Sequence, residues 1–392
     1  MKISPRRAVA LVASALALAV IAPAAQAVTV HPSSPGAHPS AVSSTGWRIN
    51  TVISVPHKAV VLVSLDPVSS GDAWAAGTLF AEYGTALRPL LEHWNGRSWR
   101  RVALPAAFAS HFSQQDIFGH VAALSSTDVW AVSFLGHYAR LHGTRWTFGA
   151  LPGGAGGKLI IDTVKAFSRA DVWAFGGISI GPKSALKLAP YAARFDGHQW
   201  TRITVPGEGI LGPVSAISAR DIWAVTGGEL PLTGIPGTAR VVRWNGASWQ
   251  QVAVQPALSS RESISALLAR SDTNVWIGGA VPNSKSGTSE LAVHWNGKTW
   301  LTASPKAPAT RQDFYLTSFT PRPAGGFWAL GGNLIGAERI WHHAGGRWSR
   351  PRPIPWNLFE LATVPNTRST WGVGWNAGLT KGLIVLHGPL PR

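Results

Sequence analysis

The segment Asp72–Gly77, which reads DAWAAG, contains the phrase that organises most of this chain of 392 residues: an acidic or small residue, any residue, Trp, and then small residues. The phrase occurs seven times, three of them degenerate, and its tryptophans are Trp74, Trp130, Trp173, Trp223, Trp276, Trp328 and Trp371. From the first to the last of them, six intervals cover 297 residues, a mean period near 50. Such a period suits a unit of four short strands and is too long for leucine-rich or ankyrin repeats.

A second phrase, WNGRSW at Trp94–Trp99, alternates with the first. Clear copies occupy residues 195–200, 244–249 and 295–300, and weaker copies occupy 141–146 and 343–348. The Asn-Gly or Asp-Gly pair supplies the positive φ that a tight hairpin turn demands. The phrase therefore predicts hairpins whose two flanking aromatic side chains face each other across adjacent strands. The residues interpreted as turn residues are Asn95, Asp196, Asn245 and Asn296.

Together the two phrases divide each period into four antiparallel strands, and radial repetition of this unit predicts an all-β, seven-bladed β-propeller over residues 46–392. The chain ends with a hairpin start, residues 386–391, that lacks its closing strand. A matching strand lies at the other terminus, where residues 46–55 resemble the outer strand that begins at Trp200. We therefore expect residues 46–55 to complete the last blade and close the ring.

The N-terminus has the pattern of an export signal. Lys2, Arg6 and Arg7 precede an apolar run of 15 residues, 8–22, and small residues at 25–27 offer a cleavage site after Ala27. The run is shorter than the roughly 20 residues that span a bilayer, so we expect cleavage and no transmembrane anchor. Residues 28–45, rich in Pro and Ser, are interpreted as a disordered linker. The protein is thus predicted to be secreted or associated with the cell envelope, by general or twin-arginine export.

Composition narrows the chemistry further. The chain has no Cys, which excludes disulfides, thiolate metal sites and a Cys nucleophile. Its formal charge is +17, and many Arg residues flank the hairpin tryptophans. A cationic rim of this kind suits an anionic cell-wall polymer, although it also serves solubility. With an export signal and no recognised nucleic-acid module, we expect no nucleic-acid partner. We also expect no cofactor, no metal and a monomeric chain.

The D-V-W-A and W-N-G-x-x-W phrases resemble the Trp-rich repeats of secreted bacterial β-propellers in the broad WD40/YVTN-like group. The resemblance covers roughly residues 46–392 and implies the propeller fold. Functions within that group range from protein docking to hydrolases and lyases, so the resemblance implies no particular activity.

The recurrent residues have structural interpretations as well as functional ones. A ring of seven tryptophans suggests sugar-stacking platforms, but Trp at one strand position in every blade is what packing between blades requires. The repeat aspartates suggest metal or acid–base chemistry, but each follows a Ser- or Thr-rich turn, where Asp caps backbone N–H groups. We therefore expect packing and capping roles. The tryptophans outside the repeat frame are Trp341, Trp356 and Trp375.

Function is expected where the repeats differ. Loops 77–89, 104–119, 177–190, 227–239 and 305–314 vary in length and sequence and fall on one face of the ring, the usual place for binding residues. The candidate binding residues are His111, Asp116, Arg311, Asp313, Tyr315 and Trp356. Inner strands carry small residues such as Ser64, Ala123 and Ala166, so few titratable groups are expected along the channel.

Two functions remain open. The first is a non-catalytic scaffold that binds an extracellular protein or glycan on the variable face. The alternative is a carbohydrate-active hydrolase or lyase at the channel mouth of the same face, in which paired carboxylates act as acid and base. The sequence does not reproduce the Asp-boxes of sialidases, and it contains no Gly-x-Ser-x-Gly or His-x-x-x-His motif in a context that supports catalysis. This favours the scaffold.

Overall fold

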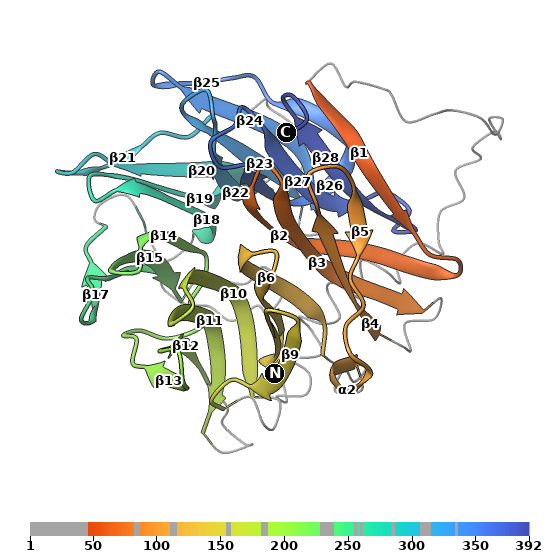
Figure 1. Ribbon diagram of the computed structural model, residues 1–392. Coiled ribbons are helices and arrows are strands. Elements are labelled where there is room, and N and C mark those ends of the chain that lie inside the picture. The colour runs from red at the N-terminus through yellow and green to blue at the C-terminus, as the bar shows by residue number, and fades with distance from the viewer. Residues whose placement is uncertain are drawn as a thin grey trace.

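The computed structural model describes residues 46–81, 87–109, 116–153, 158–181, 187–227, 239–254, 258, 262–283, 287–305, 315–333 and 336–391. Antiparallel sheets are arranged around a common centre in these segments (Figure 1). The short helix α2, Ala106–Ala109, lies between the first two sheets in the chain. No helix within the described segments is long and apolar enough to cross a membrane. The expected signal peptide and linker, residues 1–45, lie outside the described residues.

Five blades are separate four-stranded sheets whose strands follow chain order. Blade 1 consists of β2 Lys58–Ser69, β3 Asp72–Ala81, β4 Leu87–Trp94 and β5 Trp99–Arg101. Blade 2 consists of β6 Phe118–Ser125, β7 Asp128–Ser133, β8 His137–His142 and β9 Arg145–Ala150. Blade 3 consists of β10 Leu159–Ser168, β11 Asp171–Ile180, β12 Lys187–Phe195 and β13 Trp200–Ile203. Blade 4 consists of β14 Val214–Ser218, β15 Asp221–Thr226, β16 Arg240–Trp244 and β17 Trp249–Val252. Blade 5 consists of β18 Ser263–Ser271, β19 Asn274–Asn283, β20 Gly287–Trp295 and β21 Trp300–Thr302.

Blades 6 and 7 form one continuous eight-stranded sheet. Blade 6 contains β22 Tyr315–Pro321, β23 Phe327–Asn333, β24 Gly336–Ala344 and β25 Arg347–Trp348. Blade 7 contains β26 Arg352–Thr363, β27 Thr370–Trp375, β28 Lys381–His387 and the N-terminal strand β1 Trp47–Ser54. The first residues of β26 still pair with β24, so this strand is the outer edge of blade 6 before it becomes the inner strand of blade 7.

Ring closure by the N-terminal strand is confirmed. β1 pairs with β28 in antiparallel register from Trp47 opposite His387 to Ser54 opposite Lys381, and the two strands lie side by side in Figure 1. The side chain of Trp47 is fully buried, against Trp328 of blade 6 at 5.6 Å between ring centroids. The described chain is therefore an all-β, seven-bladed propeller whose last blade is completed by its first strand.

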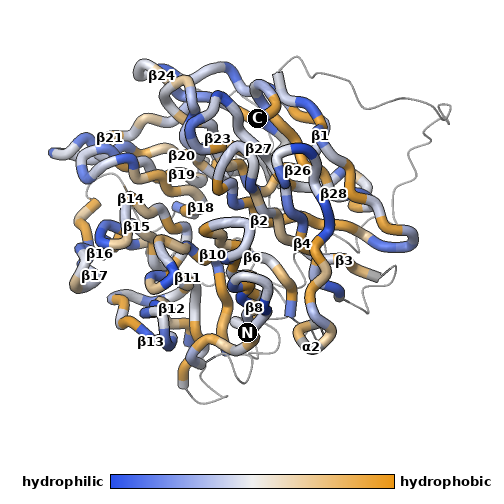
Figure 2. The backbone as a smooth tube through the Cα atoms, in the orientation of Figure 1, coloured by the Kyte–Doolittle hydropathy of each residue, from blue (hydrophilic) through white to orange (hydrophobic). Residues whose placement is uncertain are grey.

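Hydrophobic residues recur along the strands of every blade (Figure 2), and the repeat tryptophans join neighbouring blades. Trp173 of blade 3, for example, lies 5.1 Å from Trp244 in the hairpin pair of blade 4. Trp130 contacts Trp200 of blade 3 in the same way, at 5.2 Å. All seven repeat tryptophans are buried, so the packing interpretation is confirmed. The extra tryptophans Trp341 and Trp375 are buried as well.

The hairpin turns are built as expected. In the turn after Trp94, Gly96 has φ +85°, and Oδ1 of Asn95 accepts hydrogen bonds from the N–H groups of Arg97 and Ser98. The flanking rings of Trp94 and Trp99 lie 6.0 Å apart. The same side-chain to backbone pattern occurs at Asp196, Asn245 and Asn296.

The expected role of the repeat aspartates is wrong. In blade 3 the turn N–H of Ala170 is capped by Ser168, whereas Asp171 accepts two hydrogen bonds of 2.8 Å from Arg194 and one of 2.8 Å from Trp173 Nε1. Arg194 lies opposite Trp173 on the third strand, with its guanidinium over the indole. Equivalent pairs are Asp72–His93, Asp128–Arg140, Asp221–Arg243 and Asn274–His294. Each pair holds a cation or imidazole on the repeat Trp, a structural role.

Candidate functional site

The two faces of the ring differ in their connections. The strands of a blade are antiparallel and follow chain order. The turns from first to second strands and from third to fourth strands therefore share one face of the ring, which we call the short-turn face. The connections after second strands and between blades share the other, the variable-loop face. Most first strands contact the first strands of the neighbouring blades, so they line the central channel.

Three of the six sequence-predicted site residues, His111, Arg311 and Asp313, lie outside the described residues. The other three lie where the chain enters blades 2, 6 and 7: Asp116 precedes β6, Tyr315 begins β22 and Trp356 lies within β26.

Asp116 is fully engaged within the protein. Its carboxylate, 1% exposed, accepts hydrogen bonds from Ser133 Oγ at 2.8 Å, from the N–H of Leu135 at 2.9 Å and from His137 Nδ1 at 2.7 Å. The hydrogen bond with Asp116 raises the pKa of His137. These contacts fix the turn between β7 and β8. Asp116 therefore supports the variable-loop face from within the protein and is not exposed on it.

Nearby His120 is also structural. Its Nε2 donates a hydrogen bond of 2.9 Å to the carbonyl of Ile161 in blade 3, and burial lowers its pKa to about 4. The imidazole is therefore neutral at physiological pH and joins blades 2 and 3.

Tyr315 and Trp356 remain candidates for contact with a ligand. Tyr315 is the first residue of β22 and is half-buried. Trp356 is half-buried where β26 crosses from blade 6 to blade 7, packed against the hydrophobic cluster that contains Trp47 and Trp328. Close to it along β26, Phe359 is 43% exposed on the inner strand and contacts Trp375 at 6.1 Å. Exposed aromatic surface, that of Phe359, thus lies on the inner strand of blade 7, near its start at the variable-loop face.

The expectation of few titratable groups along the inner strands is wrong. Asp66 on β2, Asp162 and Lys165 on β10, and Glu360 on β26 are each half-buried. The charge of Lys165 in blade 3 acts on Asp66 in blade 1 and on Glu360 in blade 7. Side chains from three blades interact in this way because they converge on the central channel, a proximity that local sequence does not indicate.

Two of these carboxylates also join blades. Asp66 Oδ2 accepts a hydrogen bond of 2.7 Å from the N–H of Ala123 in blade 2. Glu360 Oε2 accepts one of 2.9 Å from the N–H of Leu65 in blade 1. Burial raises the pKa of both carboxyls, to about 7 for Glu360, and Lys165 opposes this effect.

Asp162 is the channel carboxyl best placed for a ligand. It is the extra residue of a bulge in β10, and it has no hydrogen-bond partner within the described part of the chain. Burial raises its pKa to about 6. A Cβ at Gly212 would lie 2.5 Å from its carboxyl, so the absent side chain at Gly212 makes room for it. Local sequence gives no reason to place Asp162 near Glu360, because the two residues belong to blades 3 and 7.

The described residues contain no group of three or more His, Asp or Glu side chains that could hold a metal ion. The channel therefore offers carboxyl groups and one ammonium group, with aromatic surface above them. Such a site can hold a polar ligand group beneath an apolar one.

Comparison with known proteins supports the fold. No protein-family model matches the sequence, and no curated protein is recognisably similar to it. Among solved structures, YCF48 bound to D1 peptide aligns over 90% of this chain and 100% of its own, with a TM-score of 0.57 and 13% identity. YCF48 from Cyanidioschyzon merolae aligns over 88% of this chain and 99% of its own, with a TM-score of 0.56 and 14% identity. The WD40 propeller of Doa1 aligns over 87% of this chain and 96% of its own, with a TM-score of 0.52 and 8% identity. At these identities the likeness shows the fold alone.

The fold and these likenesses define the class: the chain is a β-propeller rich in tryptophan, with 20 Trp residues. Within that class it is similar to the YCF48 and WD40 propellers.

Proposed function

We propose that this protein is an exported, non-catalytic scaffold that binds a segment of an extracellular protein on the variable-loop face, at the channel mouth. The observation that carries the proposal is that two side chains lie on inner strands that line the channel: Phe359, which is exposed, and Asp162, whose carboxyl has no hydrogen-bond partner among the described residues. An apolar anchor beside a few polar groups is the usual composition of a recognition site.

A polypeptide is the first ligand class to test. One of the solved structures similar to this chain is YCF48 bound to D1 peptide. Here the channel carboxyls complement a basic side chain, and Phe359 complements an apolar one. A glycan is the second class of ligand, since Tyr315 and Trp356 offer aromatic surface on the same face.

The expected binding is tested by selection from a displayed peptide library on the immobilised exported protein. Selected peptides are then measured against Phe359→Ser and Asp162→Asn. Leu301→Ser is the matched control, because Leu301 is 50% exposed on the outer strand β21, away from the channel. We expect both channel variants to weaken binding at least about tenfold, unaffected by EDTA, and the control to have no effect. Failure to enrich any peptide, or equal binding by all variants, overturns the proposal.

One observation favours the enzymatic alternative. The charge of Asp162 acts on Glu360, and both carboxyls have raised pKa values, as acid and base groups of glycosidases do. Incubation with a panel of wall and capsular glycans separates the two functions. The scaffold predicts glycan binding at most. Turnover that is abolished by Glu360→Gln or Asp162→Asn would assign the channel to catalysis instead.

A further inference from the structure

The pairing of cation and carboxylate fails in blade 6. In blades 1 to 5 the third-strand residue opposite the repeat Trp pairs with an Asp or Asn at the start of the second strand. In blade 6 the residue opposite Trp328 is His342, and Gly326 occupies the position of the acid. Gly326 has φ +71°, and a Cβ there would lie 1.9 Å from the carbonyl oxygen of His343. Since no acidic side chain fits, this blade has lost its counter-charge.

Cationic groups gather where the acid is missing. The Arg322 guanidinium, from the turn between β22 and β23, lies 4.5 Å from the ring centroid of Trp328. The imidazole of His387, from the end of β28 in blade 7, lies 4.7 Å from the same ring, and that of His342 lies 5.9 Å from it. Trp328 is therefore surrounded by basic side chains from two blades.

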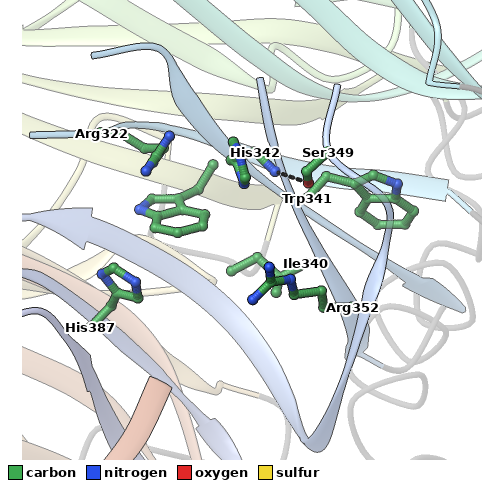
Figure 3. Close-up of a pocket in the computed structure, with 8 residues that line it drawn as sticks. Arg322, Ile340, Trp341, His342, Ser349, Arg352 and His387 are labelled. Carbon is green, nitrogen blue, oxygen red and sulfur yellow. Dashed lines mark hydrogen bonds between the residues drawn. The ribbon is translucent and has the colours of Figure 1, made fainter. Parts of the chain in front are cut away.

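These groups line a pocket. Figure 3 shows Arg322, His342, His387 and Arg352 surrounding one space, whose volume is about 150 Å³. The pocket opens where the outer edge of blade 6 is irregular: β25 ends at Trp348, and pairing with β24 resumes at Arg352. The volume corresponds to about five water molecules, enough for a small polyatomic anion.

The electrostatic environment is consistently positive. Burial lowers the pKa of Arg322. Burial, Arg322 and Arg352 lower that of His342, and burial together with Arg322, Arg48 and His342 lowers that of His387. Across the described segments, no carboxylate contributes to any of these three shifts. Concentrated positive charge beside a solvent-accessible pocket attracts an anion.

We propose that the pocket between blades 6 and 7 binds a tetrahedral oxyanion of the phosphate class, with Arg322, His342 and His387 as donors above the indole of Trp328. The site lies toward the short-turn face, apart from the channel mouth, and is independent of the proposed peptide binding. The anion replaces the carboxylate that blades 1 to 4 supply from their own sequence. It is either free phosphate or a phosphate group of an anionic polymer of the cell envelope.

The first test is isothermal titration of the exported protein with inorganic phosphate and with sulfate. Arg322→Gln is expected to weaken both affinities on the order of tenfold or more, because it removes a charged donor. The control is Arg220→Gln, an exposed arginine in the equivalent turn of blade 4, where Asp221 is retained. His387→Gln gives a second measurement if Arg322→Gln fails to fold. Absence of binding, or equal affinities of the folded pocket variants and the control, overturns the proposal.

A second test uses pH. Sulfate keeps its charge between about pH 7.5 and pH 5.5, whereas protonation of the histidines, whose pKa values are lowered by burial and by the neighbouring arginines, increases as the pH falls. Sulfate affinity is expected to rise as the pH falls, and the rise is expected to shrink in His387→Gln. An affinity independent of pH contradicts the role of the histidines. Among the described residues, the charged and titratable groups around the pocket are Arg48, Arg322, His342, Arg352 and His387.

A third titration identifies the source of the phosphate. An oligomer of glycerol phosphate is compared with inorganic phosphate at constant ionic strength. Tighter binding of the oligomer, lost in Arg322→Gln, assigns the site to an envelope polymer. Equal or weaker binding of the oligomer assigns it to the free ion. Both results support the anion site, and binding of neither probe overturns it.

Discussion

The backbone N–H of Leu65 donates a hydrogen bond of 2.9 Å to Oε2 of Glu360, a residue 295 positions later in the chain. The contact joins the inner strand of blade 1 to that of blade 7, across the seam where the ring closes. One carboxyl group thus contributes both to ring closure and to the polar channel.

This relationship gives a prediction about pH. Folding raises the pKa of Glu360 from 4.5 to about 7, so the folded protein holds this proton more tightly than the unfolded chain. The contribution of Glu360 to stability is therefore greatest below pH 4.5, falls as the pH rises toward 7 and is constant above it, with a slope of at most about 1.4 kcal/mol per pH unit. In Glu360→Gln this contribution is absent. Denaturant unfolding at several pH values is expected to show the variant gaining stability relative to the wild type between pH 4.5 and 7.

Asp162→Asn is the comparison for that experiment. The contribution of Asp162 to the free energy of unfolding changes only between pH 3.8 and about 6, because the pKa of Asp162 in the folded protein is lower than that of Glu360. Parallel profiles for both variants and the wild type would contradict the assignment of the proton to Glu360.

The closing strand gives a second prediction. Deletion of residues 46–55 removes β1 and the buried side chain of Trp47, and it exposes the edge of β28. We expect the shortened chain to unfold or to melt far below the intact protein. Trp47→Ala keeps the strand and is expected to lose about 3–5 kcal/mol of unfolding free energy. Calorimetry measures both, and an unchanged melting temperature after the deletion would refute ring closure as a source of stability.

The paired aspartates give a third prediction. Asp171→Ala leaves the guanidinium of Arg194 and the indole N–H of Trp173 without their acceptor, at an expected cost of about 1–3 kcal/mol. Asp171→Asn keeps one acceptor oxygen and is expected to cost less, as the natural Asn274 of blade 5 suggests. Urea denaturation of the two variants tests this. An equal loss of unfolding free energy in Asp171→Asn and Asp171→Ala would argue against the acceptor role.

Export is the fourth prediction. The signal pattern at residues 1–27 predicts a mature protein that begins at Val28 and is found outside the cytoplasm. N-terminal sequencing of the protein from the culture medium or cell envelope tests this. A cytoplasmic protein that retains Met1 would contradict it.

The repeated phrases were sufficient to predict the blades, their number and the closing strand, because each phrase combines a turn signal with an aromatic residue at fixed spacing. The partner of Asp171 was not predictable in that way. Arg194 follows it by 23 residues, and the two meet only through the register of β11 and β12. Local sequence therefore favoured capping, which Ser168 performs.

The channel and the anion pocket show two further limits. Lys165 and Glu360 interact only because blades 3 and 7 face a common axis, and the spacing of residues within a repeat contains no information about that. The pocket did have a signal, the degenerate phrase at Gly326–Trp328. Its meaning depended on knowing what the missing aspartate does in the other blades.

The most direct test of the proposed function is the affinity of one selected peptide for the wild type and for Phe359→Ser, measured by titration calorimetry with Leu301→Ser in parallel. Binding at the channel mouth predicts a loss of about tenfold or more for Phe359→Ser and wild-type affinity for Leu301→Ser. Equal affinity of all three proteins, or loss in Leu301→Ser alone, would contradict the proposed site.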